Sequence, residues 1–379
     1  MTKYKLRLKI DDIVTFSVFM WSITDLLAYA SMFGEYAEIK TLAAFFGRVF
    51  LRIVCFLRFV TKKRTRSEVI TSLSIVVLAE VTNYFATTRI FIPIMYILAI
   101  GNDIDDEKLI DWLLRSSIVA FLISFLSSLI GIVPLYNISL GVRRYVFGFR
   151  TANTCPAILF QIATADWFLD KSKKRIRLSA VVAFVISYWF CKCRTASLLS
   201  LSLVALEMFW SIAVRNKDRR LQQLTWKILY ATGIVASFVS IVSLAIATKW
   251  VDAVSVNTLL SGRIVLMQRY YSYYGLTFWG QKILTGTSAR EIGLSTLDNA
   301  YVYLLLSYGL VMFLIYVFLF VRLMVTYKRE KKFHRIAVLL LYALYGFSEV
   351  ISIRFVYNFS LLFFKDAIWR RQKDRSNSI

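Results

Sequence analysis

The sequence predicts an all-α, polytopic integral membrane protein with about twelve transmembrane helices and one long extracytoplasmic loop. Two observations carry this prediction. The 379 residues are 58% hydrophobic with a mean hydropathy of +0.61, which is too apolar for a soluble chain of this length. Apolar runs long enough to cross a bilayer alternate with short clusters of Lys and Arg. We therefore expect a single membrane domain over residues 1–379.

Apolar length sets the expected spans, at about 20 residues for a full crossing. They are Ile13–Phe33, Leu42–Val60, Val69–Ala86, Ile90–Ile100, Trp112–Leu135, Asn153–Leu169, Leu178–Phe190, Thr195–Val214, Ile228–Thr248, Ala300–Val321, Arg335–Ser352 and Phe355–Trp369. Twelve crossings place both termini and every Lys-rich cluster on one side, as the positive-inside rule requires. We expect a multi-pass protein of the cytoplasmic membrane with both termini in the cytoplasm and an uncleaved first span.

A formal net charge of +24 raises the question of nucleic-acid binding. Most of this charge lies in short clusters between spans, where it determines topology and meets anionic lipid headgroups. We therefore expect membrane lipids, and no nucleic acid, as partners. The four cysteines fall in or beside spans without metal-ligand spacing, so we expect structural thiols and no metal site.

Arg48 and Arg52 lie one helical turn apart in the expected second span and share a face. A charge at membrane depth is costly and usually faces a polar interior, although snorkelling stays an alternative. Three carboxylates at similar depth are candidate partners for these arginines: Glu80, Glu207 and Glu349.

Residues 250–297 form the longest polar interruption between apolar spans. Irregular polar backbone does not face lipid, so this loop lies outside the hydrocarbon or lines a cavity, and we expect the chemistry there. The face of the membrane that carries the loop is also rich in arginine: Arg89, Arg143, Arg144, Arg150, Arg194, Arg263, Arg269, Arg290 and Arg354. Arginine forks match phosphate and carboxylate oxygens, which predicts an anionic ligand at this face.

Three groups of short motifs follow one another between residues 143 and 310. They are Arg143-Arg144 with Phe147-Gly148-Phe149 and Asn153; Arg194-Thr195-Ala196; and Ser261-Gly262-Arg263 with Asp298-Asn299-Ala300-Tyr301 and Tyr308-Gly309. In this order they resemble the Wzy-type polymerases of bacterial O-antigen, capsule and exopolysaccharide assembly, within the O-antigen polymerase and ligase superfamily. The chain departs from the pattern at two places. Cys193 stands where Ser is commoner, and Cys155-Pro156 follows Asn153, whereas Pro more often precedes the Asn.

The resemblance implies a membrane glycosyltransferase that joins oligosaccharide repeat units carried on undecaprenyl diphosphate, at the outer face of the cytoplasmic membrane. It implies inverting, metal-independent glycosyl transfer without a cofactor. The partners would be a lipid-linked glycan donor, a lipid-linked acceptor and a chain-length regulator. Departure of a diphosphate requires donors that stabilise its developing negative charge, and guanidinium groups can replace a metal in that role.

Diphosphate binding is expected first from Arg143, Arg144, Arg194 and Arg263, with Arg269 and Arg290 behind them. Arg263 is the expected catalytic donor. Asp298 is the first candidate for the base that orients the acceptor hydroxyl, and Glu291 is the second. Asn153, Asn299 and Tyr301 are expected further substrate contacts. Two alternatives stay open, namely that Asp298 caps the helix after it and that Asn153 is also a cap.

Two other functions are compatible with this topology. An O-antigen ligase of the same superfamily usually depends on a histidine in an outer loop, whereas the single histidine here, His334, lies in an expected cytoplasmic turn. A lipid-linked oligosaccharide flippase also has many spans and a cationic cavity. Flippases typically show internal repetition between their halves, which is not visible in this sequence.

Overall fold

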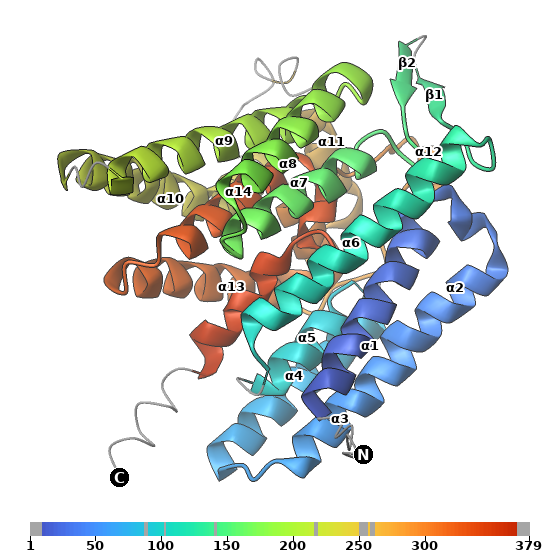
Figure 1. Ribbon diagram of the computed structural model, residues 1–379. Coiled ribbons are helices and arrows are strands. Elements are labelled where there is room, and N and C mark those ends of the chain that lie inside the picture. Colours follow the sequence, from blue (N-terminus) through green and yellow to red (C-terminus); the bar gives the residue numbers. More distant parts are fainter. Residues whose placement is uncertain are drawn as a thin grey trace, which may run out of the picture.

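The computed structural model describes residues 10–86, 90–101, 104–139, 142–215, 219–249, 257 and 262–369. Within them the chain is mostly helical, and its helices pack side by side in one bundle (Figure 1). Six helices of the described part are long and apolar enough to cross a membrane: Ile10–Ala30, Arg66–Phe85, Asp106–Leu129, Arg194–Arg215, Arg219–Ala247 and Ala300–Arg329. The chain is thus a helical, multi-pass membrane protein, and twelve crossings stay a prediction.

The described residues between Ile10 and Leu129 are mostly helical and include two π-helical turns, one of them at the end of the candidate span Ile10–Ala30. Its elements are α1 (Ile10–Asp25), η1 (Leu26–Ala30), η2 (Met32–Glu35), α2 (Ala37–Ala44), η3 (Phe45–Phe50), α3 (Leu51–Thr61), α4 (Arg66–Phe85), α5 (Ile92–Ala99) and α6 (Asp106–Leu129). The π turns η1 and η3 widen the helix locally, a feature that often occurs at functional sites.

A β-hairpin follows α6, where the sequence predicts only a polar segment. Strand β1 (Tyr136–Ser139) pairs antiparallel with β2 (Val142–Tyr145), and Asn137 lies opposite Arg144. Neighbouring side chains of a strand point to opposite faces, so the side chains of Arg143 and Arg144 lie on opposite faces of the hairpin. The prediction of an all-α chain is therefore correct for the bundle and misses this small sheet.

The remaining elements complete the bundle. They are α7 (Thr154–Phe168), α8 (Lys173–Val185), η5 (Ile186–Phe190), α9 (Arg194–Arg215), α10 (Arg219–Ala247), α11 (Arg263–Tyr274), α12 (Thr287–Arg290), α13 (Ala300–Arg329), α14 (Phe333–Ser348), η7 (Val350–Ile353) and η8 (Phe359–Phe363). Almost every residue of α7 and α14 is buried, so these two helices form the interior. Residues 131–139, 142–153 and 262–298 lie toward one end of the bundle, which we call the loop end.

Gly309 interrupts α13 at the loop end, with a φ of 84° that only glycine adopts without strain. The polar segment after α11 fills the gap, because the amide of Leu310 donates to the carbonyl of Thr277 over 2.9 Å and that of Gln281 to Ser307 over 3.2 Å. An added Cβ on Gly309 would lie 2.4 Å from the carbonyl oxygen of Phe278. The interruption thus anchors the predicted long loop to a membrane helix.

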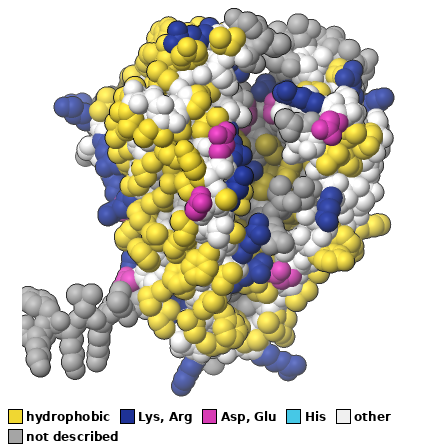
Figure 2. Space-filling model, turned by 90° about the vertical axis from the view of Figure 1, so that its right-hand side faces the viewer, with side chains coloured by type: hydrophobic (Ala, Val, Ile, Leu, Met, Phe, Trp, Pro, Cys, Tyr) yellow, Lys and Arg dark blue, Asp and Glu magenta, His cyan; other side chains and the backbone are white. Residues whose placement is uncertain are grey.

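Large apolar side chains are exposed along α3 and α4, as expected for helices that face lipid. Phe56 is 63% exposed and Val77 is 61% exposed. Figure 2 shows such side chains covering much of one face, with Lys and Arg side chains gathered along a hollow in its middle.

The predicted pairing of membrane arginines with carboxylates is correct for one of the three acids. Arg52 pairs with Glu80 over 2.8 Å. Glu207 on α9 pairs instead with Arg177 of the neighbouring α8, and Glu349 pairs at the loop end with Arg263. Arg48 pairs with none of these carboxylates in the part of the chain that the structure describes.

Candidate functional site

Three segments far apart in the sequence, together with Ile90 and Tyr303, meet at the loop end around a cavity of about 740 Å³, which we call the arginine cavity. They are the hairpin with the turn that follows it, the stretch from Arg263 to Asp298, and the stretch from Glu349 to Arg354. Seven charged side chains line it: Arg144, Arg150, Arg263, Arg290, Asp298, Glu349 and Arg354. Five arginines therefore surround two carboxyl groups.

Arg144 reaches the cavity from strand β2. Its Nε donates to the carbonyl of Cys191 over 2.9 Å, and its Nη2 donates to Oδ1 of Asn153 over 2.9 Å. These bonds fix the plane of the guanidinium at the cavity wall. Arg143, its neighbour, stacks instead on the ring of Tyr136, 3.7 Å from the centroid, and does not line the cavity.

Asn153 connects the arginine to an acid. Its Nδ2 donates to Oε1 of Glu349 over 2.8 Å, while its Oδ1 accepts from Arg144. Asn153 occupies the N-cap position of α7 but makes no side-chain capping bond, so the alternative that it acts as a helix cap is wrong. The Asn153 side-chain amide instead bonds to Arg144 and Glu349 in the wall of the arginine cavity.

Arg263 begins α11 and lies between the two carboxyl groups. Gly262 before it has a φ of 81°, a left-handed conformation that lets the chain turn directly into the helix. Nη2 of Arg263 donates to Oε1 of Glu349 over 3.2 Å, and Nε lies 3.5 Å from Oδ2 of Asp298. Ser261, the first residue of this motif, lies outside the described residues.

The Asp298 side chain does not cap α13, because Asn299, the residue after it, makes the capping hydrogen bonds. Oδ1 of Asn299 accepts from the amides of Tyr301 and Val302, at 3.0 and 2.9 Å, and Nδ2 donates to Ser243 and to the carbonyl of Phe347. The alternative in which Asp298 is the N-cap of α13 is therefore wrong. The Asp298 side chain remains 28% exposed, toward the cavity.

Burial raises the pKa of both acids of the cavity. Burial raises the pKa of Asp298, against the lowering effect of the Arg263 guanidinium. Glu349 lies just beyond the end of α14, and burial together with the charge of Asp298 raises its pKa to about 8, again against Arg263. The Glu349 side chain is more deeply buried than that of Asp298 and also meets the charge of Asp298, so Glu349 keeps its proton more readily.

Three further arginines complete the wall. Arg150 donates from Nε to the carbonyl of Ser31 over 3.1 Å, and Arg290 ends the short helix α12 with an exposed side chain. Arg354 presents a buried Nε that has no hydrogen-bond partner among the described residues. The cavity thus carries a surplus of positive charge and unsatisfied donors, which fits a multivalent anion.

The other predicted site residues lie elsewhere. Arg194 is an exposed first residue of α9, and Glu291 is exposed after α12; neither lines the arginine cavity. Arg269 lines a separate groove with Lys249 and Gln268. Asn299 and Tyr301 are buried and have structural partners, the Tyr301 hydroxyl donating to the carbonyl of Ala343 over 2.6 Å.

Glu349 is the functional candidate that the sequence interpretation did not place at the site. An expected span to Ser352 assigned it to membrane depth, whereas α14 ends at Ser348 and turns Glu349 into the cavity. Its only sequence signal is an acid five residues before an arginine of the arginine-rich face. No group of three or more His, Cys, Asp or Glu side chains suited to a metal occurs in the described part of the chain.

A comparison of the sequence with protein-family models gave no match, and a comparison with curated proteins gave none either. The function proposed below therefore depends on the cavity and on the motifs that line it.

Proposed function

We propose that this protein is a polysaccharide polymerase that joins undecaprenyl-diphosphate-linked oligosaccharide repeat units by inverting, metal-independent glycosyl transfer. The observation that carries the proposal is the lining of the arginine cavity, in which five arginines surround Asp298 and Glu349. Such a site can hold a diphosphate and also offer a carboxylate to a sugar hydroxyl. The motifs at Arg144, Asn153, Arg263 and Asp298, which resemble those of Wzy-type polymerases, all contribute to this one cavity.

In the proposed reaction the acceptor's sugar hydroxyl attacks the anomeric carbon of the donor glycan. The new glycosidic bond forms as the bond between that carbon and the diphosphate oxygen breaks, and the electron pair leaves with the lipid diphosphate. A single displacement inverts the anomeric centre. The hydroxyl proton passes to Asp298, whose raised pKa makes it a better proton acceptor than an ordinary aspartate.

The arginines act on the leaving group. Arg263 and Arg144 are held by hydrogen bonds within the network, so their donors are oriented before the negative charge develops. A protonated Glu349 lowers the negative charge that the diphosphate meets and leaves Arg263 available to it. Asn153 positions both, because its amide bonds to Arg144 and to Glu349.

Deleting the protein tests the proposal in a producing cell. We expect lipid carriers and surface glycan that bear single repeat units, because initiation and export do not require the polymerase. Full-length polymer in the deletion strain would overturn the proposal. Accumulation of repeat units only on the cytoplasmic side would identify a flippase instead.

The geometry disfavours the ligase alternative. Ligases of this superfamily usually depend on an outer-loop histidine, and His334 lies in the first turn of α14, packed against Trp167 with ring centroids 5.0 Å apart. Glu349 follows the last turn of the same helix, about 22 Å away at 1.5 Å per residue. His334 therefore cannot reach the arginine cavity.

The proposal places the loop end outside the cytoplasmic membrane and both termini in the cytoplasm. Ser288 is an exposed residue of α12 beside the arginine cavity, and the four native cysteines are buried. A membrane-impermeant thiol reagent should label Ser288→Cys in intact cells. Protection of this cysteine until the membrane is permeabilised would overturn the orientation.

A further inference from the structure

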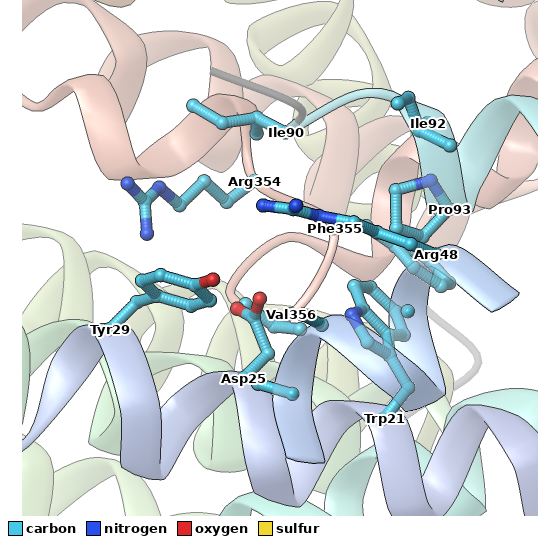
Figure 3. Close-up of a pocket in the computed structure, with 13 residues that line it drawn as sticks. Trp21, Asp25, Tyr29, Arg48, Ile90, Ile92, Pro93, Arg354, Phe355 and Val356 are labelled. Carbon is cyan, nitrogen blue, oxygen red and sulfur yellow. The ribbon is translucent and has the colours of Figure 1, made fainter. Parts of the chain in front are cut away.

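A second cavity, of about 390 Å³, lies beside the arginine cavity, and we call it the side cavity. Ile90 and Arg354 line both cavities, so the two share a wall. The side cavity is built from the end of α1 with η1, from the end of α2, from η3, from Ile90 and the start of α5, and from residues 354–356 (Figure 3). Both π turns of the first third of the chain therefore border it.

Four polar side chains point into the side cavity: Asp25, Tyr29, Arg48 and Arg354 (Figure 3). Arg48 is exposed and makes no ion pair or side-chain hydrogen bond with another described residue. The buried Nε of Arg354 has no hydrogen-bond partner among the described residues. Two guanidinium groups thus face a single carboxyl group, Asp25. An arginine within a membrane segment is costly unless something satisfies it, which indicates an anionic ligand.

The walls of the side cavity indicate that the anion is attached to a lipid. Trp21, Pro93 and Val356 contribute apolar surface between the charged groups. On the same turns that carry Arg48, Phe45 is 48% exposed and Val49 is 47% exposed, as for residues that face lipid. A headgroup can enter this cavity from the bilayer while its hydrocarbon chain stays on the apolar outside of η3.

We propose that the side cavity binds the diphosphate of the second lipid-linked substrate, the acceptor, through Arg48 and Arg354. This inference rests on the proposed polymerase function, because only a reaction between two lipid-linked glycans requires two such sites at once. The donor's diphosphate occupies the arginine cavity, where its bond breaks. The acceptor's glycan extends past Arg354 and brings its terminal hydroxyl to Asp298.

The test counts lipids bound to the purified protein by native mass spectrometry with undecaprenyl diphosphate. We expect two molecules on the wild-type protein and one on Arg48→Gln, with the second affinity weakened roughly tenfold to hundredfold by the loss of charged donors. Arg48→Lys should also lose the second molecule, because a point charge does not replace the fork. Lys40→Gln, an exposed change on the preceding α2 that lines neither cavity, should keep both.

Competition separates the possible sources of the anion. Inorganic pyrophosphate should displace the second lipid only weakly, since it lacks the hydrocarbon chain, and phosphatidylglycerol at equal concentration should not displace it. Equal competition by pyrophosphate would assign the cavity to a soluble anion. Equal competition by phosphatidylglycerol would reduce it to a general contact with anionic lipid. Either result overturns the proposal, as does binding of two lipids to Arg48→Gln.

The failure of this inference can be told apart from failure of the polymerase proposal. In a reconstituted assay, Arg48→Gln should raise the KM for the acceptor at least tenfold and leave that for the donor unchanged. Polymer formation by Arg48→Gln with an unchanged acceptor KM would overturn the proposed acceptor site in the side cavity and leave the polymerase proposal intact. If the wild-type protein bound two lipids but never formed polymer, lipid binding in the side cavity would be supported and the polymerase proposal would be overturned.

Discussion

Two clusters of charged side chains lie at opposite ends of α14 and differ in how their charges are satisfied. At the end away from the loop, Arg335 donates to Asp366 over 2.7 Å and to Asp106 over 3.2 Å. Lys365 pairs with Asp106 and donates to the carbonyl of Ile104 over 2.8 Å. Two basic side chains there meet two acidic ones, and we call this group the Arg335 cluster.

The arginine cavity at the other end has the same residue types in different proportions. Five arginines line it with two carboxyl groups, and Nε of both Arg263 and Arg354 lacks a hydrogen bond to any described residue. The burial of donors without acceptors is unfavourable, and an anion that accepts from them would make it favourable.

The comparison indicates that charge balance, rather than the presence of arginine, separates a structural cluster from the proposed binding site. The Arg335 cluster joins α6, α13, α14 and the residues after η8, so its bonds stabilise the bundle. The arginine cavity lies between loop segments, and the Nε groups of Arg263 and Arg354 have no hydrogen-bond partner among the described residues. Mutations in the two clusters should therefore have different consequences.

Arg335→Ala should have the largest effect, and that effect should be on stability. Removing one partner of a buried ion pair leaves the other charge uncompensated, which costs about 3–5 kcal/mol. We expect reduced abundance in the membrane and a lower midpoint in detergent unfolding, with unchanged polymer formed per molecule of folded protein. Arg115→Ala, which removes an exposed pair with Asp111, should cost less than about 1 kcal/mol. Equal losses from both variants would contradict the distinction.

Arg263→Lys should have the next largest effect, on activity alone. A point charge cannot bond to both carboxyl groups and a diphosphate as the fork does, so Arg263→Lys should impair polymer formation almost as much as Arg263→Ala. The loss of one oriented donor costs about 2.7–4 kcal/mol, or roughly a hundred- to thousandfold in rate. Polymer ladders from a complemented deletion strain, at matched expression, provide the measurement.

Lys282→Ala is the matched control for this pair of variants. Lys282 is an exposed residue of the same long loop and lines neither cavity. It should give wild-type ladders. If Arg263→Ala did so as well, the arginine cavity would lose its central residue and could not be the site of reaction.

Local sequence patterns were enough to predict the helical, multi-pass character of the chain and several residues that line the arginine cavity. The expected third span, Val69–Ala86, overlaps nearly all of α4, since a run of apolar residues sets both its length and its environment. Of the predicted site residues, Arg144, Asn153, Arg263, Arg290 and Asp298 do line the cavity. These residues were predicted because the positive-inside rule makes arginines unusual on the face that carries the loop, which suggested an anionic ligand.

What the sequence could not supply is which segments meet. Arg143 and Arg144 are indistinguishable in the sequence, and only the hairpin decides that one stacks on Tyr136 while the other bonds to Asn153. Glu349 was assigned to a span because hydropathy does not reveal where a helix ends. The choice between Asp298 and Asn299 as helix cap also depends on backbone geometry that a preference scale cannot resolve.

The last expected effect is on the pH dependence of stability, and it concerns the proton on Glu349. Its pKa rises from an ordinary value of 4.5 to about 8 in the folded protein, mainly through burial. Between these values the folded chain holds a proton that the unfolded chain has released, so stability is greatest below about 4.5 and falls as the pH rises toward 8. Glu349→Gln carries no proton to lose. Its stability relative to the wild type should increase across this interval and become constant above it.

Unfolding midpoints of the purified proteins between pH 5 and pH 9 would measure this difference. Glu291→Gln, an exposed change in the same loop, should run parallel to the wild type at every pH. A constant offset between Glu349→Gln and the wild type would mean that Glu349 is ionised throughout and fully balanced by Arg263. The arginine cavity would then resemble the Arg335 cluster, with its charges satisfied by one another, and the contrast between the two ends of α14 would weaken.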